Sequence, residues 1–134
     1  MNNNPIYASD NFMWREFYCP LLKSVPGSDL TLHHIGKLEE LRVRFDGPLR
    51  VNSGYRSPEH NNRVGGAPNS MHLEFASDLT PVRSANMDQL DRLAELAEAL
   101  GFSGIGRYNT FLHLDCREFI GRGQGRWDNR EETT

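Results

Sequence analysis

The sequence has no long hydrophobic run and no targeting signal, and these absences exclude several classes of protein. Among its 134 residues, no apolar stretch approaches the roughly 20 residues that a transmembrane helix needs. The first ten residues have neither the basic start nor the apolar segment of a secretory signal. We therefore expect a protein that is made in the cytoplasm, carries no signal peptide and does not bind membranes.

The sequence also has no excess of basic residues. The chain has 15 Lys and Arg against 18 Asp and Glu, which gives a formal net charge of −3. Such a balance does not favour general binding to nucleic acid or to anionic lipid, so we expect no nucleic-acid partner. There are no internal repeats, and the length suits a single domain over residues 1–134. We expect a monomer in which residues 1–8 and 128–134 are flexible.

Cysteine is scarce. Cys19 and Cys116 lie far apart in the sequence and form no Cys-x-x-Cys pair, so a zinc knuckle built on cysteine is excluded. The two thiols could pair in an oxidising compartment if the fold brought them together. Because the sequence has no secretory signal, we favour two unpaired cysteines.

Apolar residues recur at helical spacing over residues 29–45 and again over residues 86–100, where Gly101 provides a stop. Short segments rich in apolar residues predict strands at residues 49–53, 76–79, 103–108 and 111–116. A long loop with several Gly and Pro residues is expected over residues 54–70. Near the C-terminus, Trp127 is expected to dock locally.

Three residues have the chemistry of a metal site. His72 and Asp78 are close in the sequence, and His113 lies in a segment where apolar and polar residues alternate as on a half-buried strand. If the fold brings them together, two imidazoles and one carboxylate form the ligand set of a catalytic zinc site with a fourth position open for water. Zinc lowers the pKa of bound water to about 7 and polarises a carbonyl, so such a site could hydrolyse an amide.

Neighbouring residues could serve this site. Asp115 would share a strand face with His113, so it could carry a proton or fix the orientation of the imidazole. Arg56 could grip a substrate carboxylate through two parallel hydrogen bonds, and Glu74 is a further possible base. Each signal is weak singly, because a histidine and an aspartate at this spacing occur by chance and a lone loop arginine is usually solvated.

The other three histidines are expected to have ordinary roles. His33 and His34 are adjacent in the first predicted helix, where neighbouring side chains diverge by about 100°, so they cannot easily share a metal. We expect both to be partly exposed. His60 is expected to fix the loop that contains it.

Six short motifs occur in order along the chain. They are Ser-Gly-Tyr-Arg-Ser-Pro-Glu-His-Asn at 53–61, Val-Gly-Gly-Ala at 64–67, Ser-x-His at 70–72, Ala-x-Asp-Leu at 76–79, Gly-Ile-Gly-Arg-Tyr at 104–108 and Phe-Leu-His-Leu-Asp at 111–115. Together they resemble the family of zinc D-Ala-D-Ala carboxypeptidases and L-alanyl-D-glutamate endopeptidases, murein peptidases that share a fold with hedgehog signalling domains. The likeness runs from about residue 10 to Trp127 and is greatest to the small single-domain members of phages and bacteria.

The resemblance implies an α+β fold in which a small antiparallel sheet carries the metal site and packs against helices. It implies Zn²⁺ bound by His72, Asp78 and His113. It also implies a substrate-holding or electrophilic role for Arg56 and a role near the metal for Ser70. The implied reaction is hydrolysis of a peptide bond next to a D-residue in the peptidoglycan stem peptide. The protein would act at the cell wall only if released or delivered, as in phage lysis or from a virion.

The chain departs from the family's pattern between the first two ligands. The family has His-x-x-Gly-x-Ala-x-Asp, whereas residues 72–78 here are His-Leu-Glu-Phe-Ala-Ser-Asp, one residue shorter and without glycine. We place the loss in the turn at residues 73–75, because a slip in the following strand would turn Asp78 to the opposite face. Many relatives also carry an acidic residue or histidine shortly before the last ligand, and residues 109–112 offer none. Asp115, which fits the His-x-Asp form of one branch, is our candidate catalytic residue beside Arg56.

Two other functions stay open at this point. The shortened turn and the missing base would suit a non-catalytic relative that binds peptidoglycan or a protein partner. General metal chemistry would also allow hydrolysis of esters or phosphodiesters, although the acidic charge counts against nucleic acid as the substrate. Ligand side chains that point apart would favour the binding function.

Overall fold

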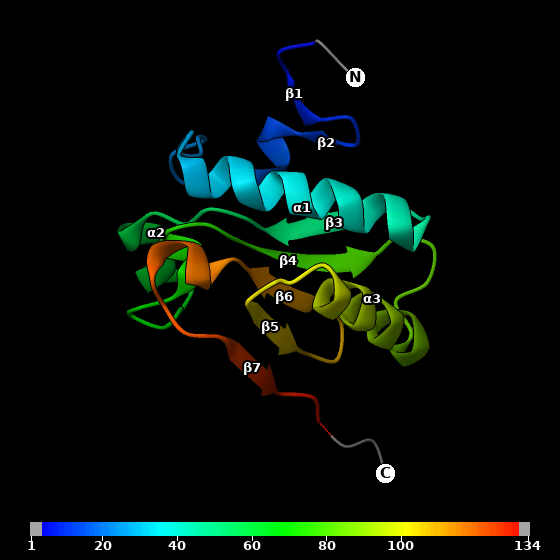
Figure 1. Ribbon diagram of the computed structural model, residues 1–134. Coiled ribbons are helices and arrows are strands. Elements are labelled where there is room, and N and C mark those ends of the chain that lie inside the picture. The colour runs from blue at the N-terminus through cyan, green and yellow to red at the C-terminus, as the bar shows by residue number, and fades with distance from the viewer. Residues whose placement is uncertain (1–3, 132–134) are drawn as a thin grey trace.

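The computed structural model describes residues 4–131 and shows helices packed against a five-stranded sheet (Figure 1). In chain order, the elements are β1 (Tyr7–Ser9), β2 (Phe12–Met13), the 3-10 helix η1 (Trp14–Phe17), α1 (Asp29–Phe45), β3 (Leu49–Ser53), α2 (Pro58–Arg63), the 3-10 helix η2 (Met71–Leu73), β4 (Ala76–Pro81), α3 (Met87–Ala99), β5 (Gly104–Arg107), β6 (Leu112–Asp115), the 3-10 helix η3 (Arg117–Ile120) and β7 (Gly125–Asp128). Of the ends expected to be flexible, residues 1–3 and 132–134 lie outside the described residues, whereas Tyr7, Ala8 and Asp128 lie in strands.

The main sheet has the strand order β3-β4-β6-β5-β7. Neighbouring strands are antiparallel except β7, which pairs with β5 in parallel. The predicted α+β class with a small sheet against helices is confirmed. The parallel edge strand was not predicted, and it is the element that carries Trp127. A separate two-stranded hairpin is formed by β1 and β2 near the N-terminus.

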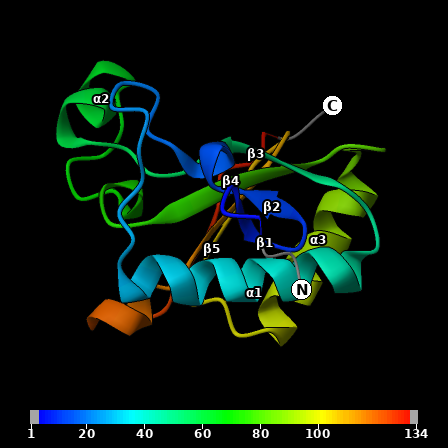
Figure 2. The same cartoon turned by 90° about the horizontal axis from the view of Figure 1, so that it is seen from above.

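Helices α1 and α3 cover one face of the sheet, and α2 lies at one end of it (Figures 1 and 2). Helix α1 begins where the Ser28 side chain accepts a hydrogen bond from the Thr31 amide, and it ends at Asp46, whose φ is 54°. Helix α3 begins with the same kind of cap, in which Asn86 accepts from the Gln89 amide. Such caps satisfy amides that the first turn leaves without a partner, and both predicted helices are confirmed.

The pleat of the sheet separates a core face from a polar face. Ser77 pairs with Leu114, and the Ser77 hydroxyl contacts His34 of α1, so this face is turned towards the helices. One residue further, Asp78 pairs with His113. Since side chains alternate along a strand, Asp78 and His113 lie together on the face that the helices leave uncovered.

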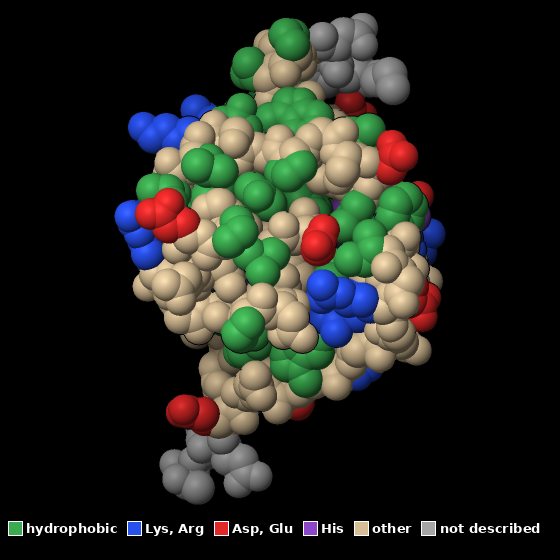
Figure 3. All heavy atoms as spheres, turned by 90° about the vertical axis from the view of Figure 1, so that its left-hand side faces the viewer, with side chains coloured by type: hydrophobic (Ala, Val, Ile, Leu, Met, Phe, Trp, Pro, Cys, Tyr) green, Lys and Arg blue, Asp and Glu red, His purple; other side chains and the backbone are tan. Residues whose placement is uncertain are grey.

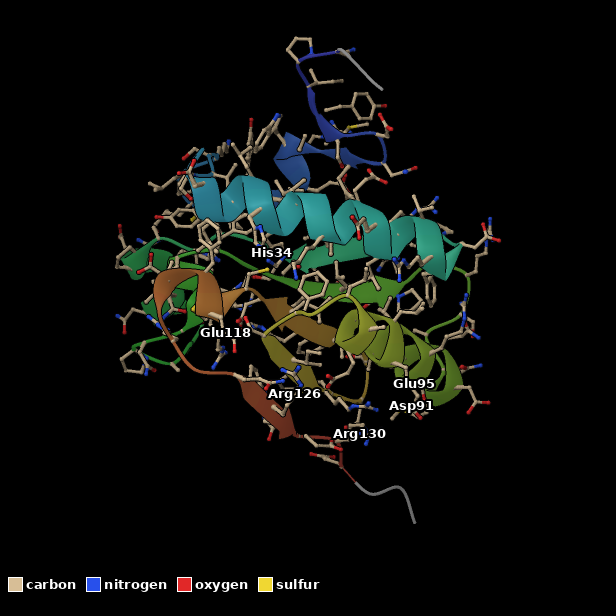
Figure 4. All side chains as sticks on the ribbon, viewed as in Figure 1. His34, Asp91, Glu95, Glu118, Arg126 and Arg130 are labelled. Atoms are coloured by element: carbon tan, nitrogen blue, oxygen red, sulfur yellow. The ribbon has the colours of Figure 1, made fainter. Side chains whose placement is uncertain are left out.

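His34 is buried, and the prediction that it is partly exposed was wrong. Its side chain lies between α1 and the sheet (Figure 4), with Nε2 2.8 Å from the Ser77 hydroxyl. Four-residue spacing places His34 in one row with the buried Leu30 and Leu38, so its position on the apolar stripe decides its burial. His33, one position earlier, is exposed as predicted.

The segment 54–70 is not the continuous loop that we predicted, because it contains α2. The Ser57 side chain caps this helix by accepting from the His60 amide, and Pro58 occupies its first turn. Proline lacks only an amide that would be unpaired there, and its fixed φ suits a helix start. We treated Pro58 as a loop residue, so the short helix was missed and His60 belongs to it.

The two cysteines are buried and unpaired. Cys19 accepts a hydrogen bond from the Ser57 amide at 3.4 Å, so it supports the start of α2. Cys116 lies on the core side near His34, 3.8 Å from its Nδ1. The two thiols therefore belong to different local contacts, in agreement with the preferred prediction.

The face on the left-hand side of Figure 1 mixes hydrophobic, basic and acidic side chains, and the charged groups are scattered over it (Figure 3). Near the start of α1, Leu22 and Leu32 are more than half exposed. Within residues 4–131, no helix combines the length and the apolar character that crossing a membrane requires.

Candidate metal centre

The site is formed by three side chains from two strands and one 3-10 helix. Asp78 of β4 and His113 of β6 are paired across the sheet, and His72 lies in η2, just before β4. One oxygen of Asp78 is 3.0 Å from Nδ1 of His113 and 3.2 Å from Nε2 of His72. One potential ligand atom from each of these buried residues lies within 4.8 Å of the others. The structure thus brings together the three residues that we predicted as ligands, in a group that could hold a metal ion.

The orientation of His72 suits a metal ligand. Its Nδ1 is 2.6 Å from the carbonyl oxygen of Gly54. A carbonyl only accepts hydrogen bonds, so we assign the proton to Nδ1. Nε2 is then the nitrogen that can coordinate a metal, and it is the atom that faces Asp78.

In His113 the two ring nitrogens have the opposite roles to those in His72. Its Nε2 is 2.7 Å from Oδ2 of Asp115, and its Nδ1 faces Asp78. Arg117 also donates to Asp115, from Nε at 2.9 Å and from Nη2 at 2.8 Å. A carboxylate that fixes one ring nitrogen leaves the other free for a metal, as is common for metal-binding histidines. The donor set therefore fits a divalent metal on chemical grounds.

The buried carboxylates are held in their charged forms. Burial raises the pKa of Asp78, but hydrogen bonds with His113 and His72 outweigh it, and its pKa is below the usual range. Burial likewise raises the pKa of Asp115, but hydrogen bonds from Arg117 and His113 bring its pKa below the usual range. Burial lowers the pKa of His113, yet hydrogen bonds to Asp115 and Asp78 raise it overall above 6.5. These contacts thus favour the charged forms of both carboxylates and the protonated form of the His113 imidazole.

Two glycines of β5 make room for this arrangement. A Cβ at Gly104 would lie 2.1 Å from Oδ1 of Asp115, and a Cβ at Gly106 would lie 2.3 Å from the ring of Trp127. Both distances are shorter than any real side chain allows. The Gly-x-Gly spacing therefore clears the polar face for the carboxylate that orients His113 and for the Trp127 ring, whose centroid is 5.1 Å from that of His113.

The other two predicted site residues lie beside the ligands. Nη2 of Arg56 is 3.8 Å from Oδ2 of Asp78, and the Arg56 amide donates to the carbonyl of His72 at 2.8 Å. Nε of Arg56 donates to the Ser53 hydroxyl at 3.2 Å, which fixes the guanidinium. Ser70 accepts from the His72 amide at 3.2 Å and so caps η2.

The shortened turn before β4 is anchored by Phe75. This side chain is fully buried, with its ring centroid 5.6 Å from that of Phe17 and 4.9 Å from that of His34. Glu74 is exposed and does not line the pocket. The turn therefore closes through η2 and a core aromatic, and Asp78 keeps the face that it shares with His113.

A pocket of about 720 Å³ opens over the three ligands. Its lining includes Arg56 and Ser70, together with residues that we did not single out as site residues, among them Tyr108, Phe111, Arg117, Arg122 and Trp127. Trp127 donates from Nε1 to the Tyr108 hydroxyl at 2.9 Å, and the Tyr108 and Phe111 rings stack with centroids 4.3 Å apart. Tyr108 belongs to a motif noted above. Arg117 is held by the neighbouring Asp115, and Trp127 lies on β7, whose pairing with β5 was not predicted.

Comparisons with known proteins complete this description. The model of the family described as Peptidase M15 matches residues 10–115. None of the curated proteins matches the chain. The match confirms the resemblance proposed from the motifs, and it spans every predicted site residue from Arg56 to Asp115.

Proposed function

The chain belongs to the peptidase M15 family, and from this we propose that it is a zinc-dependent metallopeptidase acting on the peptidoglycan stem peptide. The bond that it hydrolyses is a peptide bond next to a D-residue. The observation that carries the proposal is the convergence of His72, Asp78 and His113 in the floor of one pocket. We assign these three residues as the zinc ligands.

Bound zinc supplies a Lewis acid for the peptide carbonyl and lowers the pKa of a water molecule, so that water can act as the nucleophile near neutral pH. The chain's own contribution is to fix the ligand atoms. Gly54 holds His72 so that Nε2 faces the site, and Asp115 holds His113 so that Nδ1 does. A protein that fixes both rings in advance loses little entropy when the metal binds.

Of the two roles left open for Asp115, orientation of His113 is favoured over proton transfer. Asp115 is fully buried, does not line the pocket, and engages both oxygens with His113 and Arg117. A general base must come within hydrogen-bond reach of the proton that it takes. We therefore assign Asp115 as a positioning residue, although it stood among our candidate catalytic residues.

Arg56 and Ser70 are assigned to substrate binding. The Arg56 guanidinium is held at the edge of the ligand cluster and lines the pocket, where it suits a carboxylate or a carbonyl oxygen that becomes negative during the reaction. Ser70 caps the start of η2 and lines the pocket from there. With Arg56 near the reacting group, its removal should lower kcat as well as raise KM.

The geometry weighs against the two alternative functions. A non-catalytic relative was suggested by the shortened turn, but the ligand side chains point together despite that turn. Hydrolysis of esters or phosphodiesters has no separate structural feature in its favour. The same pocket would serve a protein delivered to the cell wall during phage lysis or from a virion.

The test is metal analysis combined with hydrolysis of defined stem peptides. We expect one zinc per chain at pH 7, release of a peptide fragment or a D-amino acid, and loss of this activity in EDTA. His72→Ala and His113→Ala should lose both zinc and activity, whereas Glu74→Gln should keep both, because Glu74 lies outside the pocket. No bound metal in excess zinc would refute the proposal, and retention on purified sacculi without cleavage would support the binding function.

A further inference from the structure

The pocket over the metal centre concentrates positive charge in an acidic protein. Its lining contains three guanidinium groups, from Arg56, Arg117 and Arg122, and a single carboxylate, from Asp78. The whole chain, by contrast, has a formal net charge of −3. A cleft that collects charge of one sign raises the local concentration of ligands of the other sign.

Two of these three arginines have a carboxylate partner in the structure. Arg117 is paired with the buried Asp115 at 2.8 Å, and Arg56 lies 3.8 Å from Asp78. Within residues 4–131, Arg122 forms no ion pair, although it too lines the pocket. Of the three pocket arginines, Arg122 is therefore the one whose charge no carboxylate of the described residues neutralises.

Arg122 is nevertheless held in place. Its amide donates to the Arg117 carbonyl at 3.0 Å, directly after Gly121, whose φ of 84° turns the chain at the end of η3. Its Nη1 donates at 3.0 Å to the carbonyl of Asn69, which also lines the pocket. Nε and Nη2 of Arg122 make no hydrogen bond to the described residues, so this edge of its guanidinium group remains available to a ligand. A guanidinium edge with two parallel N–H groups matches a carboxylate.

Arg122 and Arg56 stand at the two ends of one short segment. A Cβ at Gly66 would lie 3.1 Å from Nη1 of Arg56, whereas Arg122 bonds to Asn69. The Cα atoms of Gly66 and Asn69, three residues apart, are separated by at most roughly 11 Å. A short peptide could therefore place one group at Arg56 and a carboxylate at Arg122 together.

Arg122 also lies beyond the part of the chain that the family match covers, which ends at Asp115. It lies in the segment that links η3 to β7, the edge strand that pairs with β5 in parallel. The contribution of this segment therefore comes from the chain's own structure and not from the family match.

We infer that Arg122 is a specificity-determining residue that binds a second carboxylate of the substrate, remote from the scissile bond. This inference rests on the proposed peptidase function and narrows it. The substrate is a stem peptide with at least two free carboxylates, one of which pairs with Arg122. Amidation of that carboxylate removes its negative charge, so the peptide binds more weakly and is cleaved less.

The test uses L-Ala-γ-D-Glu-L-Lys-D-Ala-D-Ala, which has one free carboxylate on D-Glu and one at the C-terminus, and its two singly amidated forms. Each is presented to zinc-loaded wild type, Arg122→Gln and Arg44→Gln. Arg44 is exposed on α1, so its variant controls for the loss of one positive charge. KM and kcat are measured for peptides that are cleaved, and Kd by calorimetry for those that are not.

For wild type, we expect one of the two amides to raise KM or Kd about tenfold or more, the effect of losing a charge-assisted hydrogen bond. The KM or Kd of Arg122→Gln for the parent peptide should equal that of wild type for the amidated peptide. Amidation of the same carboxylate should not raise the KM or Kd of Arg122→Gln any further. Arg44→Gln should behave as wild type, and kcat should change less than KM.

An amide effect of equal size in wild type and Arg122→Gln would overturn the inference. So would an equal loss for all three peptides in Arg122→Gln, because that would assign Arg122 only to holding the Asn69 segment. Failure of the peptidase proposal looks different: no peptide is cleaved, while the Kd values still show whether the carboxylate preference depends on Arg122.

Discussion

Asp115 accepts from His113 within the same strand, with Oδ2 2.7 Å from Nε2, and this contact determines which nitrogen of His113 faces the metal centre. Residues two apart on a strand share a face, so the His-x-Asp spacing builds the pair locally. Arg117, two residues further, donates to both oxygens of Asp115 and keeps its charge. The segment 113–117 therefore holds a proposed ligand, the carboxylate that orients it and the cation that stabilises that carboxylate.

The first prediction separates the two roles considered for Asp115. Asp115→Asn keeps the shape but removes the charge that favours the Nε2–H form of His113. We expect zinc affinity to fall about 10–100-fold, measured by competition with a chelator. The control is Asp91→Asn, a partly exposed carboxylate that pairs with Arg107 and Arg130 and does not line the pocket, so zinc affinity should be unchanged. An inactive Asp115→Asn that binds zinc as tightly as wild type would indicate proton transfer instead.

The second prediction concerns protons released when zinc binds. The pKa of His113 in the metal-free protein is raised above 6.5, so at pH 6.5 more than about half of this imidazole is protonated. A metal on Nδ1 displaces that proton. Calorimetric titration in two buffers with different ionisation enthalpies should show more than about half a proton released per zinc at pH 6.5. Above pH 6.5, the Asp115→Asn variant should release fewer protons per zinc than wild type. Zinc binding without any proton release would contradict the assignment of His113 as a ligand.

The sequence contained enough to predict the two long helices, most strands and the three residues that meet at the candidate metal centre. The 3.6-residue period over 29–45 and the caps at Ser28 and Asn86 are local signals, and the structure follows them. These three residues are the proposed ligands because the motifs that contain them occur in the family's order. The pairing of β4 with β6 then explains physically why Asp78 and His113 meet.

The missed features depend on contacts between distant segments. Nothing near Trp127 indicates that β7 pairs in parallel with β5, because the partner strand is about twenty residues away. The position of Trp127 in the pocket follows from that pairing. His34 was mistaken for a partly exposed residue, although its spacing from Leu30 and Leu38 placed it on the buried stripe. In that case the signal was present, and the polarity of histidine outweighed it in our interpretation.

The third prediction tests the anchor of the shortened turn. Phe75→Ala removes a fully buried ring between Phe17 and His34, so we expect a loss of about 3–5 kcal/mol in the free energy of unfolding, measured in urea. Zinc affinity should fall as well, because the turn positions His72. Leu32→Ala, at an exposed site, should change stability by about 0.5 kcal/mol or less. Full zinc affinity in a destabilised Phe75→Ala would show that η2 positions His72 without this anchor.

The last prediction concerns the response of stability to acid. Burial lowers the pKa of His34 to about 3, even though the charge of Asp115 raises it. In the unfolded chain the imidazole titrates near its ordinary pKa of 6.5, so between these values the unfolded state binds one more proton. The stability that depends on neutral His34 is present above pH 6.5 and is lost as the pH falls, by up to about 1.4 kcal/mol per pH unit. His34→Gln should flatten the fall in the free energy of unfolding of the metal-free protein between about pH 6.5 and pH 5.5, where carboxylates of the unfolded chain, with pKa values of about 3.9–4.3, are still almost fully ionised. His33→Gln, one position away on the exposed side of α1, should keep the wild-type slope of the free energy of unfolding against pH. Equal slopes in wild type and His34→Gln would show that the buried imidazole is not the group that makes the fold sensitive to acid.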